Sequence, residues 1–91
     1  MGTVRAKFTV NTIKRTMGSM PKTVDGKTTY VPTEMWTVSM SPVYGNGDPG
    51  HENTKFWQAP PSGSIELGTV NKAAVDQLEL GREVYVDFTP A

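Results

Sequence analysis

The chain has 91 residues, and this length predicts a single domain over residues 1–91, because natural domains rarely contain fewer than about 50 residues. Hydrophobic residues make up 36% of the chain and charged residues 20%, which is typical of a soluble folded domain and argues against a disordered polyelectrolyte or a membrane span. Cysteine is absent and His51 is the single histidine, which excludes disulfides, thiolate metal sites and paired-imidazole sites, so we expect neither a metal nor a cofactor.

The net charge is zero, but the charges are unevenly distributed along the chain. Residues 1–27 carry six basic residues and one acidic residue, a charge of +5. Residues 28–91 carry three basic and eight acidic residues, a charge of −5. Two interpretations follow: a basic first strand is neutralised by an acidic neighbouring strand, or a basic face binds an anionic partner.

The first predicted strand covers residues 4–12, where apolar and polar residues alternate strictly. The inward positions are Val4, Ala6, Phe8 and Val10. Ile13 breaks this alternation, which predicts a bulge or the end of the strand near Thr12. Residues 17–20 are expected to form a loop, and the pair Asp25-Gly26 predicts a two-residue hairpin turn.

Pro32 is expected to interrupt this ribbon, and alternation resumes over residues 35–43 with Trp36, Val38 and Met40 inward. Residues 45–63 are rich in Gly and Pro and are expected to form a long loop, of the kind that often carries function. Ile65 and Leu67 mark a further strand.

A short helix is predicted over residues 71–79, capped by Asn71 and stopped by Gly81. The last strand places Val84, Val86 and Phe88 inward, with Glu83, Tyr85 and Asp87 outward. The fold class that we expect is therefore all-β, a small barrel or sandwich of four to five strands plus a hairpin and one short helix. The five-stranded oligonucleotide-binding barrel also carries a late helix, but two strands follow that helix and only one follows here.

No pattern in the sequence indicates an enzyme. Gly45, Gly47 and Gly50 match a phosphate-binding spacing, but no strand-loop-helix unit surrounds them and Pro49 lies inside the pattern. His51 and its acidic neighbours in the same loop do not form a hydrolytic triad on rigid supports. We therefore predict a non-catalytic protein with no catalytic residues.

The adjacent aromatic residues Phe56 and Trp57 are the first candidates for binding. Neighbouring residues of an extended segment point in opposite directions, so one ring is expected to be exposed for base stacking or for a protein interface. The alternative is a loop that folds back and covers one end of a barrel. The outward residues Arg5, Lys7 and Tyr85 complete the predicted binding set if the first and last strands are neighbours.

Several blocks of the sequence carry a resemblance. They are Val4–Phe8, Val38–Tyr44, Phe56-Trp57, Pro61–Leu67 and Gly81–Ala91. Together they look like a group of short proteins of unassigned activity encoded in tailed-phage and viral metagenome sequences. The hairpin around Asp25-Gly26 lies outside this similarity. The resemblance implies a viral origin and assigns no role to any residue.

The expected function is that of a phage-type accessory binding module that acts through protein–protein contacts, with a viral or host protein as partner. The alternative is a small OB-like β-barrel that binds single-stranded nucleic acid or a nucleotide. We expect no membrane partner, leave a homo-oligomer open, and expect the protein in the host cytoplasm or the virion. Nucleic-acid binding predicts exposed rings on the same face as the basic strand, whereas protein binding predicts an uncharged apolar patch or an open sheet edge.

Overall fold

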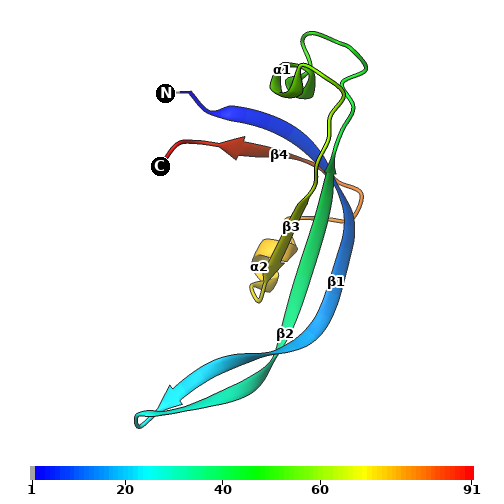
Figure 1. The fold of residues 1–91 in the computed structure, drawn as a ribbon. Helices are drawn as coiled ribbons and strands as arrows, with labels where there is room; N and C mark the ends of the chain where they lie inside the picture. The colour runs from blue at the N-terminus through cyan, green and yellow to red at the C-terminus, as the bar shows by residue number, and fades with distance from the viewer. Residues whose placement is uncertain (1) are drawn as a thin grey trace.

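The chain forms one open sheet of four antiparallel strands with two short helices, seen in a computed structural model that describes residues 2–91. In chain order the elements are β1 (Val4–Val24), β2 (Lys27–Pro42), α1 (Glu52–Trp57), β3 (Ile65–Thr69), α2 (Lys72–Val75) and β4 (Glu83–Phe88). The strand order is β3-β2-β1-β4, so the long strands are central and β3 and β4 are the edges (Figure 1). The prediction of a mostly β chain is confirmed, but this single sheet does not close into the expected barrel.

The hairpin of β1 and β2 is much longer than the sequence analysis predicted. The phase change near Thr12 marks a bulge and not the end of a strand, because the register shifts between Val10 and Thr12. Ile13 then pairs with Val38 on the buried side of the sheet. The strand continues through residues 17–20, so the prediction of a loop there is wrong.

The predicted turn at Asp25-Gly26 is confirmed, with φ of 50° and 76° at the two residues. Pro32 was expected to interrupt the ribbon, yet β2 runs through it. The pair Val24 and Lys27, which flanks the two-residue turn, is hydrogen-bonded. From this pair outward, non-bonded and hydrogen-bonded pairs alternate along the hairpin. Pro32, opposite Ser19, falls on a non-bonded pair, so its nitrogen faces outward and no ladder hydrogen bond is lost.

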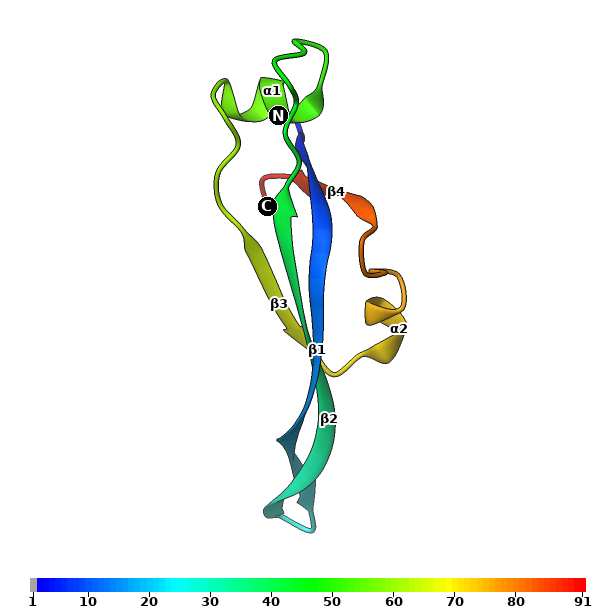
Figure 2. The same ribbon diagram turned by 90° about the vertical axis from the view of Figure 1, so that its right-hand side faces the viewer.

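The outer part of this hairpin projects far beyond the rest of the sheet. We call residues 14–35 the arm and residues 2–13 and 36–91 the body; the arm leaves the body at the lower end of Figures 1 and 2. The protein measures 58 × 31 × 19 Å, and its radius of gyration of 17.4 Å exceeds the value of about 12 Å expected for a compact chain of this length. No residue of the arm is buried.

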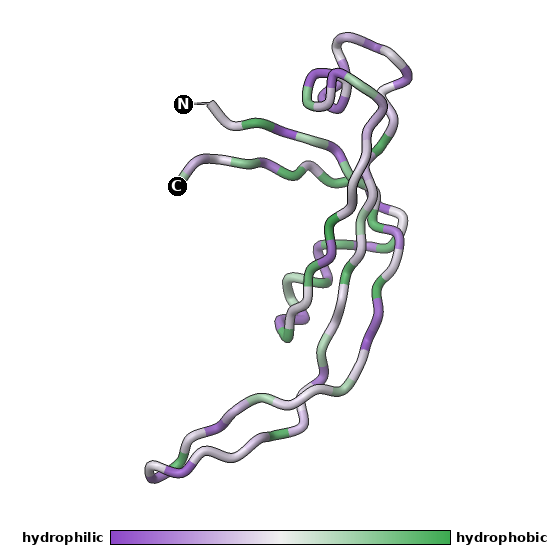
Figure 3. Tube along the Cα trace, in the orientation of Figure 1, coloured by the Kyte–Doolittle hydropathy of each residue, from purple (hydrophilic) through white to green (hydrophobic). Residues whose placement is uncertain are grey.

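The hydrophobic core lies on one side of the body, which we call the core side. Its buried apolar residues are Ala6, Phe8, Val10, Val38, Met40 and Val75. Both helices contribute to this core, since Trp57 of α1 and Val75 of α2 pack against it. The inward positions that the alternation predicted on β1, β2 and β4 face this side, whereas the arm is pale or purple with short green stretches in the hydropathy view (Figure 3).

Both helices begin at side-chain caps. Asn71 caps α2 as predicted, accepting from the Ala73 N–H at 3.1 Å, but α2 ends at Val75 and is shorter than the predicted span of 71–79. The expected loop over 45–63 contains α1, and that part of the prediction is wrong. His51 caps α1 by accepting from the Asn53 N–H at 3.0 Å, and Gln58 ends the helix in the left-handed conformation.

Candidate interaction surface

The basic residues of β1 lie beside acidic residues of β4, on the side of the sheet opposite the core. Arg5 pairs with Asp87 in the register, and its Nε and Nη2 donate to the two carboxylate oxygens at 2.6 and 3.0 Å. Lys7 Nζ lies 4.0 Å from a carboxylate oxygen of Glu83. The first and last strands are therefore neighbours, and both cations contact carboxylates of the adjacent strand.

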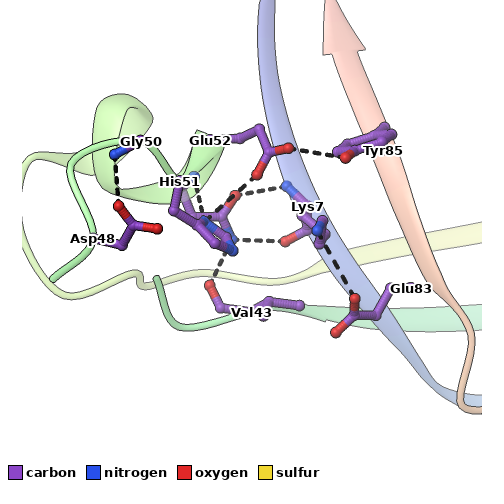
Figure 4. Close-up of polar contacts among 9 residues, drawn as sticks. Lys7, Val43, Asp48, Gly50, His51, Glu52, Glu83 and Tyr85 are labelled. Carbon is purple, nitrogen blue, oxygen red and sulfur yellow. Dashed lines mark hydrogen bonds and ion pairs between the residues drawn. The ribbon is translucent and has the colours of Figure 1, made fainter. Parts of the chain in front are cut away.

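Tyr85 joins these two cations on the same side of the sheet. Its ring centroid lies 4.5 Å from the Arg5 guanidinium carbon and 5.3 Å from the Lys7 ammonium, within range of cation–π attraction. Its hydroxyl donates to Glu52 Oε1 at 2.9 Å, which connects β4 to α1 across β1 (Figure 4). About half of the Tyr85 residue is exposed. These contacts bring together Arg5, Lys7 and Tyr85 of the predicted binding set.

These contacts lower the pKa of two carboxyl groups. The hydrogen bond from Arg5, followed by its charge, lowers the pKa of Asp87. The pKa of Glu52 is lowered first by its own backbone N–H and then by the Tyr85 hydroxyl. Both groups favour the ionised form in the folded protein, so protonation in acid opposes folding.

Replacing Arg5 with Gln is expected to raise the pKa of Asp87 toward its ordinary value, as followed by NMR of the side-chain carboxyl carbon. In the wild type the folded pKa lies below the unfolded value of about 3.9, so the pair stabilises the fold above that pH and the contribution is lost as the pH falls. The variant should therefore lose less stability on acidification. Arg15→Gln, which removes the arm's pair with Glu34, is the control and should leave Asp87 unchanged. An unmoved Asp87 pKa in Arg5→Gln contradicts the assignment.

Phe56 and Trp57 do not lie with the basic residues. Trp57 packs against Phe8 of the core at a ring-centroid distance of 6.1 Å, and its indole N–H donates to the Ser62 carbonyl at 3.1 Å. Phe56 contacts Trp57 at 4.6 Å and Phe88 of β4 at 6.1 Å. Because the two residues are in a helix and not in an extended segment, both rings reach the core side of the sheet.

Asn53 holds α1 against β1 at the point where β2 leaves the sheet. Its Oδ1 accepts from the Lys7 N–H at 2.6 Å, and its Nδ2 donates to the Lys7 carbonyl at 2.8 Å and to the Val43 carbonyl at 2.5 Å. The Lys7 carbonyl also accepts from the Val43 N–H at 3.1 Å, so the side-chain amide completes the pairing of Lys7 at the point where β2 ends. Asn53 is fully buried, and it is the principal residue that the sequence analysis missed.

From Asn53 toward the start of β1, no strand of residues 2–91 pairs with the same edge. Backbone groups of alternate residues in a strand point to opposite sides, and those of Val10 bond to Gly81 and Arg82 next to β4. Those of Lys7 and Arg5 therefore point the other way. Asn53 and the Val43 N–H satisfy Lys7, whereas no residue among 2–91 forms a hydrogen bond with the backbone N–H or carbonyl of Arg5.

An apolar surface lies beside this free edge. Val4 is 53% exposed, Phe56 41% and Phe88 47%; we call these three residues the end patch. A cavity of about 380 Å³ opens next to it, between the start of β1 and α1. Its lining residues are Thr3, Val4, Arg5, Glu52, Lys55 and Phe56. The wall therefore combines the free backbone edge, an exposed ring and the Lys55 ammonium, for which no ion pair is found within residues 2–91.

Comparisons with protein-family models, with curated proteins and with solved structures found no match to this chain. Within residues 2–91, no group of three or more His, Asp or Glu side chains is placed to hold a metal ion. No helix in that range has the length and apolar character needed to cross a bilayer.

Proposed function

We propose that the chain is a non-catalytic binding module that receives an extended segment of a protein partner at the end patch. The observation that carries this proposal is the coincidence of Val4, Phe56 and Phe88, all about half exposed, with the unpaired backbone edge at Arg5. An extended peptide can pair its backbone with the free edge at Arg5 and cover the apolar end patch with alternate side chains. The resemblance of the chain to tailed-phage proteins suggests a viral or host protein as the partner, in the virion or the host cytoplasm.

The second candidate, single-stranded nucleic acid or a nucleotide, is supported by the exposed ring of Tyr85 beside Arg5 and Lys7. Its support is weaker, because both cations already contact carboxylates and because Phe56 and Trp57 contact the other side of the sheet. Fluorescence of Trp36 and Trp57, titrated with short oligonucleotides and nucleotides at low and high salt, tests this candidate.

Serine replacement in the end patch is expected to weaken partner binding at least tenfold and leave the fold intact, since both rings are already half exposed. The test compares proteins recovered on immobilised wild type with those recovered on Phe56→Ser/Phe88→Ser. Leu80→Ser is the matched control, because Leu80 is an exposed apolar residue outside the end patch. A partner that binds all three proteins equally argues against the end patch.

A further inference from the structure

The arm exposes apolar side chains along its whole length. Met20, Val24 and Val31 are exposed on the ribbon face that also carries Lys14, Lys22 and Lys27. Met17, 66% exposed, and Tyr30, 71% exposed, lie on the opposite face. A two-stranded ribbon is at best marginally stable in water when nothing covers it. The arm therefore gains stability from any surface that covers these side chains.

The arm and the body carry opposite charge. The arm contains four basic and two acidic residues, a charge of +2, and the described body contains five basic and seven acidic residues, a charge of −2. Within residues 2–91 the one ion pair of the arm joins Arg15 to Glu34 at 3.3 Å. No carboxylate of these residues lies within ion-pair distance of the three exposed lysines Lys14, Lys22 and Lys27.

We propose that the arm docks on the acidic body of a second copy of this chain, and that the second arm docks on the first body in return. Arm and body are complementary in charge, because the three arm lysines have no ion-pair partner among residues 2–91 and the described body carries two more carboxylates than cations. A neutral chain with segregated charges also lacks the net repulsion that keeps proteins apart. The proposal is independent of the end patch and its partner.

The size of the arm is sufficient for a stable dimer. Residues 14–24 span about 36 Å as a strand, and a ribbon about 10 Å wide then offers roughly 360 Å² on one face. In a reciprocal dimer each copy contributes its arm and the surface that the other arm covers, roughly 720 Å². This estimate is close to the 800 Å² or so per partner that specific interfaces typically bury. Figures 1 and 2 show the arm projecting clear of both helices, so its faces are accessible.

A charge-swap experiment on the full chain tests the proposal by sedimentation equilibrium at low and high salt. The arm variant is Lys14→Glu/Lys22→Glu/Lys27→Glu. The body variant is Asp48→Lys/Glu66→Lys, at exposed carboxylates that form no ion pair among residues 2–91. We expect the wild type to dimerise at low salt and each variant alone to associate at least tenfold more weakly. An equimolar mixture of the two variants should recover the dimer, because both arm-to-body contacts are then complementary again.

The controls distinguish arm docking from unfolding and from a general effect of charge reversal. Lys55→Glu/Lys72→Glu reverses lysines of the body, gives the chain a net charge of −4, and should weaken the association much less than the arm variant does. Far-UV circular dichroism establishes that each variant is folded. A monomeric wild type at low salt, or a dimer insensitive to the arm variant, overturns the proposal. So does a monomer that binds a mixed-sequence single-stranded oligonucleotide through the arm lysines, since the arm then serves nucleic acid.

Discussion

Replacing Asn53 with Ala is expected to lower the free energy of unfolding by about 2–4 kcal/mol, measured by urea denaturation. The substitution leaves the Lys7 N–H and the Val43 carbonyl without the partner that the buried amide supplies, while the Lys7 carbonyl keeps the Val43 N–H. A chain of this length has a total stability of roughly 5–13 kcal/mol, so the loss is a large fraction of it. The effect should extend to α1, because Asn53 is its buried contact with β1.

The variant Asn53→Asp separates the hydrogen-bond pattern from the shape of the side chain. It keeps the volume, but it replaces the amide donor with an oxygen that faces two carbonyls, so it should destabilise at least as much as Asn53→Ala. Asn11→Ala is the control, because Asn11 is exposed and donates only to the Ser41 hydroxyl, and its cost should stay within about 0.5 kcal/mol. Equal small effects at Asn53 and Asn11 would contradict the anchoring role.

The alternation of apolar residues was sufficient to predict much of the sheet. Phe8, Val38 and Val86 face the core side as expected, because a period of two is dictated by the geometry of a strand. The strand continues through Pro32 because this residue falls on a non-bonded pair, counted from the turn at residues 25–26. Treating every proline as a strand breaker ignores its position in the hydrogen-bond pattern. Closure into a barrel could not be derived from the pattern at all, because an inward face is equally apolar in an open sheet.

The candidate site was predicted in part. Arg5 and Tyr85 share a side of the sheet because the alternation put both outward and the pairing of β1 with β4 makes them neighbours. Phe56 and Trp57 were separated from that set by helix α1, for which His51 is an uncommon cap and the surrounding Gly and Pro residues indicated a loop. Asn53 carries no local signal, since its role depends on the place where β2 ends in space.

Truncation of Phe8 to Ala is expected to cost about 3–5 kcal/mol, which unfolds the protein outright if its stability is at the low end for its size. Phe8 is 5% exposed at the centre of the core and contacts Trp57, so its removal opens a cavity under α1. Phe56→Ala removes an equal side chain that is half exposed, and it should cost less than about 1.5 kcal/mol. Urea denaturation of both variants therefore distinguishes a core ring from a surface ring. If the two losses were equal, Phe56 would belong to the core, and the end patch would lose the side chain on which the proposed partner site depends.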